Sequence, residues 1–317
     1  MPMKDTGFHI PVLAEKATQY LITRTDGIYV DCTLGGGGHA RHFLETISSQ
    51  AFLIGIDADA EAVAYAAGQL GQFSNTHLRQ AFYDNLDVVL LETGKYPVDG
   101  VFFDLGISSF QVDKLHRGFS FQKEAPLDMR FNQQQKLTAA EVVNRYSEED
   151  LGRIIREYGE ERRWRAIARE IVLRRAVTPF RTTTDLVEVV KDVVGDDHLN
   201  KSLARVFQAI RIEVNQELER LRRALQLAFN ALREGGRLVV ISYHSLEDRM
   251  VKNFMRDKTG RCTCPPDLPE CVCGAKQELR LLTRHVVRPD AEEVRANPRS
   301  RSARLRAAEK VVPFQQL

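Results

Sequence analysis

Several features are scarce in this chain of 317 residues, and each scarcity excludes a class of protein. The net charge is only +2, so the overall field is weak and any affinity for nucleic acid must come from local patches. No apolar run reaches the roughly 20 residues that a membrane-spanning helix needs, and no charged-then-apolar secretory start is present. We therefore expect a cytoplasmic protein with no membrane partner.

Cysteine is also scarce, with five residues of which Cys32 stands alone. A disulfide framework is not expected in a chain of this size without an export signal. The other four form two close pairs, Cys262-x-Cys264 and Cys271-x-Cys273, which could supply four thiolates to a structural zinc ion. Reduced, unpaired thiols are the alternative, because C-x-C spacing is less diagnostic than C-x-x-C.

The chain does contain enough apolar residues, 43%, for an ordinary globular protein of about two domains. Strand-like runs alternate with helical stretches, which predicts a doubly wound, mainly parallel α/β sheet. The predicted strands are 28–32, 52–57, 77–81, 98–104 and 237–243. Two later runs, 279–287 and 305–312, could complete the sheet as an antiparallel pair.

More than a hundred residues separate the fourth and fifth predicted strands, which is far beyond a normal crossover. Apolar periodicity in this region predicts helices over 148–176 and 186–194. We therefore predict an all-helical domain at 112–204, inserted into a sheet domain formed by 1–111 and 205–317. A helix over 205–232 would return the chain to the sheet.

The stretch Asp31-Cys-Thr-Leu-Gly35-Gly-Gly37-Gly38-His39 carries the clearest chemistry. Glycines between a strand and a helix let the backbone approach a ligand closely and expose helix N–H groups to it. The preceding carboxylate favours a positively charged ligand, which fits S-adenosylmethionine better than NAD. Asp57 follows about 20 residues later, the spacing at which an acidic side chain binds ribose hydroxyls. NAD stays open, because Gly35-x-Gly37-x-x-Ala40 also fits a dinucleotide pattern.

Polar residues follow two later strands. After the fourth, Asp104 and Ser108 could accept hydrogen bonds from an amine that receives a methyl group, which makes both candidate catalytic residues. His244 and Ser245 follow the fifth strand at the same sheet edge, as a candidate catalytic residue and a candidate substrate contact. A polar turn after a strand and a structural histidine are the ordinary alternatives.

Local basic patches could bind RNA. Residues 295–306 contain five arginines and no acidic residue, and Arg299 and Arg301 are the proposed contacts. Arg117 and Arg130 lie near phenylalanines, a combination that can stack a base and hold its phosphate. Strong salt dependence of binding would follow.

Stretches in order along nearly the whole chain resemble the bacterial ribosomal RNA small subunit methyltransferase H family, also called MraW. They include 9–13, 31–39, 104–111, 117–121, 126–130, 158–162, 207–215, 244–249 and 297–302. The resemblance implies a Rossmann-like class I methyltransferase fold with an inserted helical domain for substrate recognition. It also implies transfer of a methyl group from S-adenosylmethionine to N4 of a cytidine in 16S rRNA, with the small ribosomal subunit as partner.

Carried onto this chain, the family's cofactor contacts fall on seven residues: Gly37, Gly38, His39, Asp57, Phe82, Asp104 and Gln111. Phe82 would pack beside the adenine, and Arg211, within a matching stretch, joins the substrate-binding candidates. Tyr243 stands where the family usually has Phe, a departure that we expect to leave the chemistry untouched. The sequence leaves open whether the protein is a monomer or a homodimer.

Three alternatives remain at this stage. A DNA N-methyltransferase commonly has a Pro-Pro-aromatic turn after the fourth strand, which Asp104-Leu-Gly-Ile lacks. An NAD-dependent oxidoreductase would share the glycine-rich turn. An RNA-binding assembly factor without turnover would share the RNA-binding features and lack only the reaction.

Overall fold

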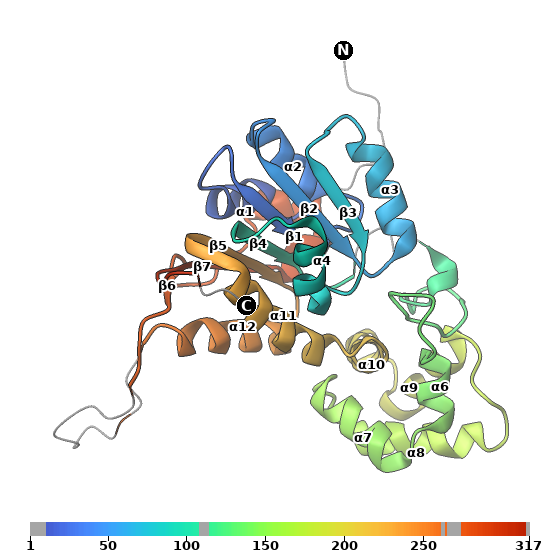
Figure 1. The fold of residues 1–317 in the computed structure, drawn as a ribbon. Coiled ribbons are helices and arrows are strands. Elements are labelled where there is room, and N and C mark those ends of the chain that lie inside the picture. The colour runs from blue at the N-terminus through green and yellow to red at the C-terminus, as the bar shows by residue number, and fades with distance from the viewer. Residues whose placement is uncertain (1–10, 108–113, 261–263, 265–273, 315–317) are drawn as a thin grey trace. The chain divides into compact units, whose positions relative to one another are not determined.

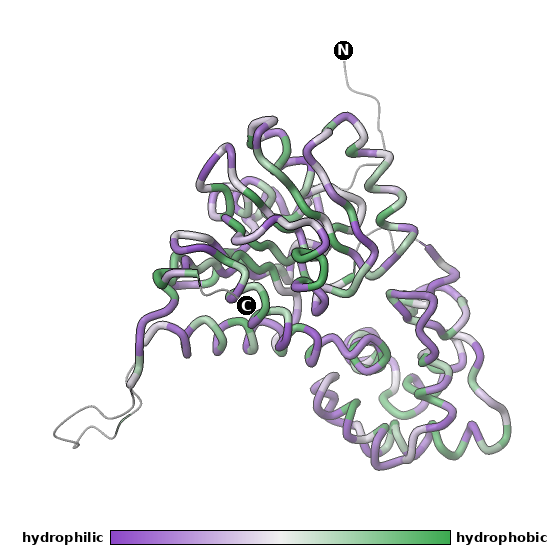
Figure 2. Tube along the Cα trace, viewed as in Figure 1, coloured by the Kyte–Doolittle hydropathy of each residue, from purple (hydrophilic) through white to green (hydrophobic). Residues whose placement is uncertain are grey.

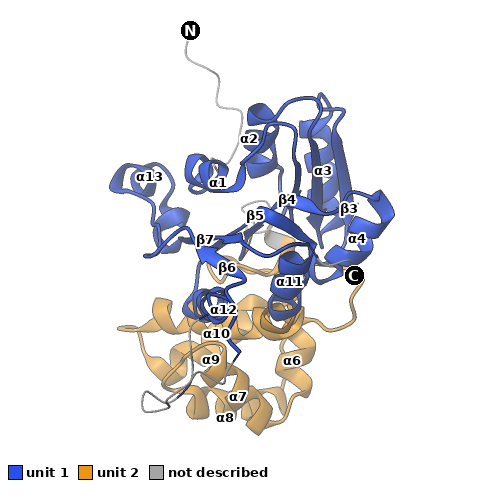
Figure 3. Cartoon of the chain, turned by 60° about the vertical axis from the view of Figure 1, so that its left-hand side comes forward, with its two compact units in different colours: residues 1–106, 220–317 blue, residues 107–219 orange. Residues whose placement is uncertain are grey.

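The computed structural model describes residues 11–107, 114–260, 264 and 274–314. The chain divides into two compact units: unit 1 comprises residues 1–106 with 220–317, and unit 2 comprises residues 107–219 (Figure 3). The sequence-based boundary at 204/205 differs from this division, because it falls inside the continuous helix α10 (Leu199–Asn215).

Unit 1 is built on a seven-stranded sheet with the order β3-β2-β1-β4-β5-β7-β6 (Figure 1). The first five strands are β1 (Ile28–Asp31), β2 (Phe52–Asp57), β3 (Thr76–Gln80), β4 (Val98–Asp104) and β5 (Leu232–Ser242), and they are mutually parallel. The last two, β6 (Leu279–Leu281) and β7 (Arg304–Lys310), are antiparallel to each other, and β7 is antiparallel to β5. The predicted doubly wound, mainly parallel sheet with a final antiparallel pair is therefore confirmed.

The central strands consist mainly of buried apolar residues because both faces of the sheet are covered. Neighbouring residues alternate between the two cores, so that Phe102 packs on one face and Phe103 on the other. Figure 2 shows the hydrophobic residues concentrated along these strands. One core receives residues from the helices α1 (Ala14–Leu21), α2 (Gly38–Thr46) and α3 (Ala60–Leu70). The other receives them from α4 (Leu86–Thr93), α11 (Glu217–Ala231) and α12 (Ser245–Asp257).

Unit 2 has a core of its own, formed mainly by helices. These are α6 (Ala139–Arg145), α7 (Glu148–Glu157), α8 (Trp164–Arg175), α9 (Thr183–Val194) and α10, preceded by the short 3₁₀ helix η2 (Leu115–Arg117). The named secondary-structure elements of this unit are therefore all helices, as the sequence predicts. No helix in the described ranges is long and apolar enough to cross a membrane.

Two predicted long helices are each divided in the structure. The segment 148–176 forms α7 and α8, because the chain turns at Gly159 and at Glu160, whose φ is +50°. The segment 205–232 falls in α10 and α11, which are separated by Gln216 at φ +52°. Both breaks place a residue other than glycine in the left-handed region, which the apolar periodicity does not signal.

Candidate active site at the strand edge

Three carboxylates gather at one edge of the sheet because each ends a parallel strand. Asp31 is the last residue of β1, Asp57 of β2 and Asp104 of β4. Strand β1 lies between the other two, and Asp31 is in register with Gly55 and Phe102. This is the edge at which open α/β sheets bind ligands, as the sequence predicted.

The glycine-rich loop between β1 and α2 needs glycine at two positions. Gly35 has φ +49° and Gly37 has φ +84°, and a Cβ on Gly37 would lie 3.3 Å from the Ala66 Cβ. Gly37 is the N-cap of α2 and Gly38 is its first residue, with no side chain capping the helix. The loop therefore presents unblocked backbone N–H groups at the start of a helix, where an anionic ligand group is favoured.

Asp57 fixes the shape of this loop. The N–H of Gly35 donates to Asp57 Oδ2 at 2.7 Å, and the N–H of Asp59 donates to Oδ1 at 2.9 Å. A carboxylate offers about four acceptor positions in all. The carboxylate is thus held in one orientation while it can still accept hydrogen bonds from ligand hydroxyls.

Asp31 is fully buried and incompletely paired. Its Oδ1 accepts a hydrogen bond from the N–H of Thr33 at 3.1 Å, whereas its Oδ2 is buried with no hydrogen-bond partner in the described structure. Burial raises the pKa of Asp31 to about 7, and the negative charges of Asp104 and Asp57 add to this effect. A cation placed against Oδ2 would relieve both the burial and the repulsion.

Asp104 has different surroundings at its two oxygens. The hydroxyl of Tyr243 donates to Oδ1 at 2.8 Å, and Nδ1 of His39 lies 3.5 Å from Oδ2. Burial raises the pKa of Asp104 to about 7; the Tyr243 hydrogen bond opposes this rise and the charge of Glu247 adds to it. The side chain keeps 24% of its surface exposed, so a ligand can reach it. The expectation that Tyr243 leaves the chemistry untouched did not foresee that its hydroxyl contacts the candidate catalytic residue.

His39 is buried and neutral. Its Nε2 lies 2.9 Å from the carbonyl oxygen of Val12 and must therefore carry the proton, which leaves Nδ1 as an acceptor facing Asp104. Burial lowers the pKa of His39 to about 4. The ring also lies 4.7 Å, between centroids, from Phe102, so both packing and hydrogen bonding fix its position.

Phe82 follows β3 at this edge and has a cation over its ring. The Arg220 guanidinium lies 3.7 Å from the Phe82 ring centroid, and its Nη1 donates to Asp84 Oδ1 at 2.8 Å. The sequence gives no signal for Arg220, because 136 positions separate it from Asp84 and no motif links the two. A ring of a ligand that stacks on Phe82 would share this neighbourhood with Arg220.

His244 has a structural position. It is the N-cap of α12, where its Nδ1 accepts a hydrogen bond from the N–H of Glu247, and its Nε2 lies 3.1 Å from Glu247 Oε1. Both ring nitrogens thus face Glu247, which favours a capping role over the candidate catalytic role. Ser245 is the first residue of α12 and is half-buried.

Three of the predicted RNA-binding arginines lie in internal contacts of unit 2. Arg117 is 1% exposed and donates to the carbonyl oxygens of Arg130 and Phe131. Arg130 forms a two-pronged ion pair with Asp128, at 3.0 and 2.7 Å. Arg211 forms a similar pair with Glu217, at 2.8 and 2.9 Å. These contacts make the three arginines structural supports in this structure, whereas the sequence predicted that they bind RNA. Their burial in internal contacts explains the difference.

The arginine-rich segment near the C-terminus is divided by its surroundings. Arg299 and Arg301 are exposed on the 3₁₀ helix η3 (Pro298–Ser302), which follows α13 (Ala291–Ala296). In contrast, Arg304 and Arg306 on β7 both contact Asp248 of α12, at 3.4 and 2.7 Å. Arg295, on α13, is exposed as well, so these three arginines are the part of the segment that a phosphate can reach.

Some predicted residues fall outside the described ranges, namely Ser108, Gln111, Cys262, Cys271 and Cys273. Cys264 is described and is half-buried. The zinc site and the roles of Ser108 and Gln111 stay predictions.

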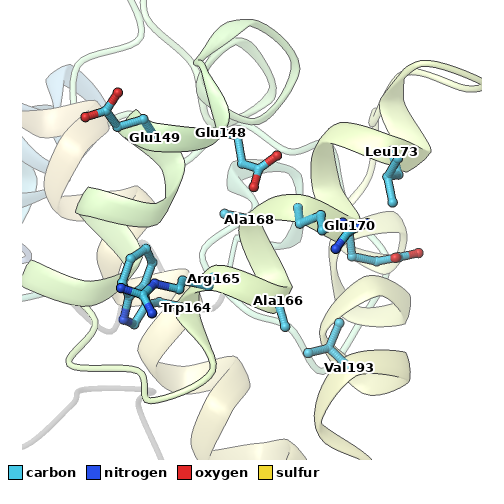
Figure 4. Close-up of a pocket in the computed structure, with 10 residues that line it drawn as sticks. Glu148, Glu149, Trp164, Arg165, Ala166, Ala168, Glu170, Leu173 and Val193 are labelled. Carbon is cyan, nitrogen blue, oxygen red and sulfur yellow. The ribbon is translucent and has the colours of Figure 1, made fainter.

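A separate pocket of about 1010 Å³ lies within unit 2, between α7, α8 and α9 (Figure 4). Its wall includes Trp164, with the Arg165 guanidinium 4.6 Å from the ring centroid. Acidic and basic side chains both line it, so it favours no single charge, and its described lining contains none of the predicted site residues.

A seven-stranded sheet with this order, an antiparallel β7 and a carboxylate after a glycine-rich turn together define a class I methyltransferase fold. The profile of the MraW methylase family matches residues 6–311, and the chain belongs to that family.

Proteins named "Ribosomal RNA small subunit methyltransferase H" are similar over almost the whole chain. The one from Caldicellulosiruptor saccharolyticus is 49% identical over 304 residues, covering 96% of this chain and 99% of that protein. Those from Clostridium botulinum and Dehalococcoides mccartyi are 45% and 48% identical over 306 residues. Each alignment covers 96% of this chain, and 99% and 87% of those proteins, respectively.

Proposed function

We propose that this protein transfers a methyl group from S-adenosylmethionine to the exocyclic N4 of a cytidine in 16S rRNA. The observation that carries the proposal is the buried carboxylate of Asp31, whose Oδ2 has no hydrogen-bond partner in the described structure, directly before the glycine loop. The name that the relatives carry, a small subunit rRNA methyltransferase, supports the substrate class.

The residues at the strand edge fit S-adenosylmethionine. Asp31 can neutralise a positive group, the open start of α2 can receive a carboxylate, and Asp57 can accept hydrogen bonds from ribose hydroxyls. Phe82 with Arg220 offers a surface on which a purine can stack. When bound, the cofactor supplies a methyl group on a positively charged sulfur.

Asp104 is the residue that we assign to the acceptor amine. Its partly exposed carboxylate can accept a hydrogen bond from the N4 amino group and so direct the nitrogen lone pair toward the methyl group. A cytosine in a folded RNA must be unpaired or flipped from its stack to present this amine.

Recognition of the RNA is assigned to two regions. Arg299 and Arg301 would contact phosphates, and unit 2 would serve as a substrate-recognition module. Binding through such contacts weakens as the salt concentration rises, because the release of counterions from the RNA then becomes less favourable. Action on ribosomal RNA would place the protein in the cytoplasm.

The test uses methyl-labelled S-adenosylmethionine and small ribosomal subunits from cells that lack this enzyme, followed by nucleoside mass spectrometry. Label in N4-methylcytidine is the expected result. Label in another nucleoside would overturn the N4-cytidine assignment. RNA binding with no label, in a preparation that binds the cofactor, would favour an assembly factor without turnover, and binding of NAD in its place would favour an oxidoreductase.

A further inference from the structure

The hydroxyl of Tyr243 is the only donor that the described contacts give to either side-chain oxygen of Asp104. It comes from the residue directly after β5, whereas Asp104 ends the neighbouring strand β4. The turn that follows β4 packs against the same ring, because a Cβ on Gly106 would lie 3.2 Å from Tyr243 Cδ2. Gly106 has φ +104°, so both its backbone conformation and its lack of a side chain allow the ring to lie there.

His39 acts on the other oxygen in the opposite sense. Its Nε2 proton is directed to the Val12 carbonyl, so the Nδ1 lone pair faces Asp104 Oδ2 at 3.5 Å. Two lone pairs that face each other repel, and a proton on Oδ2 would turn this repulsion into a hydrogen bond. The two neighbours therefore make the oxygens of Asp104 unequal. Oδ1 already accepts a hydrogen bond from Tyr243, and Oδ2 is the favoured place for an added proton.

We propose that Tyr243 and His39 are positioning residues that hold Asp104 with Oδ2 ready to take the proton released by the methylated amine. This inference rests on the proposed function. The amine nitrogen forms a bond to the methyl carbon while the carbon–sulfur bond breaks and its electron pair stays on sulfur. The nitrogen then carries the positive charge, and it loses one proton, which binds Oδ2 of Asp104 and is shared with Nδ1 of His39.

Other charged groups around Asp104 set the pH at which this can happen. Asp31 on β1 and Glu247 on α12 carry negative charge, which disfavours an ionised Asp104, and neutral His39 on α2 does the same through its lone pair. Tyr243 favours the ionised form by donating to it, and Glu293 lies near Tyr243 and raises the pKa of that phenol further. Burial, with the charge of Glu247, raises the pKa of Asp104 to about 7 against the opposing hydrogen bond of Tyr243, and near this pH a group can both take and release a proton.

The test is Tyr243→Phe, which removes only the hydroxyl. Loss of the donor should raise the pKa of Asp104 further, by about one unit for an ordinary hydrogen bond. Methyl transfer requires the ionised carboxylate, so the acid limb of the kcat profile should move to higher pH by the same amount. The rate should approach that of the wild type above the new pKa, and the dissociation constant of S-adenosylmethionine should stay unchanged.

Tyr29→Phe is the matched control. The Tyr29 hydroxyl is also hydrogen-bonded, donating to the Arg24 carbonyl at 2.7 Å, but it contacts the chain that precedes β1, at the opposite end of this strand from Asp31. This variant should lose stability and keep the pH profile of the wild type. An equal loss of rate at every pH in Tyr243→Phe would show a merely structural role and overturn the inference.

A second readout does not depend on turnover. In protein labelled with ¹³C at the aspartate carboxyls, the Asp104 signal, identified by its absence in Asp104→Asn, should titrate near pH 7 and shift upward in Tyr243→Phe. An unchanged midpoint would overturn the inference while leaving methyl transfer itself intact. Failure of the wild-type protein to methylate any RNA would instead count against the proposed function, so the two failures are distinguishable.

Discussion

Buried carboxylates occur in both units, and their partners differ. In unit 2, Asp128 and Glu217 each face an arginine in a two-pronged ion pair. Burial alone would raise the pKa of Asp128, but the hydrogen bonds from Arg130 outweigh it and hold that pKa below its usual value. At the sheet edge of unit 1, Asp31 has no such cation among the described residues, and its pKa is raised to about 7.

This difference in partners distinguishes carboxylates that stabilise the fold from a carboxylate that a ligand would complete. A buried charge with a full set of partners stabilises one conformation of the chain, whereas a buried charge that lacks one costs stability and is retained where a ligand completes it. On this physical criterion the strand edge is the candidate active site, although the sequence of unit 2 is also rich in charged residues.

The largest effect is expected from breaking an ion pair of unit 2. Arg211→Met should lower the free energy of unfolding by about 3–5 kcal/mol, because it leaves the nearly buried Glu217 without its guanidinium partner. Urea titration of the variant against the wild type measures this loss.

The double variant Arg211→Met/Glu217→Leu is the control for that prediction. It removes both charges and should recover most of the stability, as buried pairs replaced by apolar residues commonly do. Folded molecules of either variant should bind S-adenosylmethionine as the wild type does. If the affinity for S-adenosylmethionine instead fell when the charge of Arg211 was removed, Arg211 would have a role in cofactor binding. That result would contradict the comparison of the two units.

Asp31→Asn tests the other side of the comparison. The variant should bind S-adenosylmethionine at least about tenfold more weakly, because it loses the charge that meets a positive group. In the wild type the affinity should rise between pH 6 and pH 8, as Asp31 ionises through its pKa of about 7. Calorimetric titration at several pH values measures both, and the variant should lack the dependence due to Asp31.

The same residue predicts a pH dependence of stability with a definite sign. The folded-state pKa of Asp31 is above its ordinary value of 3.8, so the folded state binds more protons than the unfolded state between about pH 4 and pH 7. Protonation of Asp31 therefore stabilises the folded state. Its full contribution to the free energy of unfolding is present below pH 4 and is lost as the pH rises through 7. Asp31→Asn should show a shallower fall over this window, and an identical slope in both proteins would contradict the raised pKa.

The smallest effect concerns the exposed arginines. Arg299→Ser/Arg301→Ser should weaken RNA binding and reduce the slope of log affinity against log salt by up to about 2, one for each phosphate that is no longer neutralised. Arg41→Ser, which removes an exposed arginine from α2, is the matched control. Filter binding at several salt concentrations gives the slopes, and equal slopes for both variants would mean that η3 does not face the RNA.

Local patterns were sufficient to predict the sheet, because its central strands contain short apolar runs and three of them end in aspartate. They were insufficient for the helix breaks at Glu160 and Gln216, where the backbone adopts a conformation that neither residue favours. The residue type also led to a different expectation for Arg117, which the sequence predicted as a phosphate contact and which is buried in the structure. The contact of Tyr243 with Asp104 joins positions 139 residues apart and depends on two strands being neighbours, so only the folded sheet reveals it.

In the proposed function, the strand edge of unit 1, and Asp104 in particular, carries the reaction. The most direct test is single-turnover methyl transfer by Asp104→Ala at saturating cofactor and ribosomal subunit. The rate should be at least about 100-fold below that of the wild type, the range of a lost acid–base contribution, with RNA affinity largely retained. A rate close to that of the wild type would contradict it.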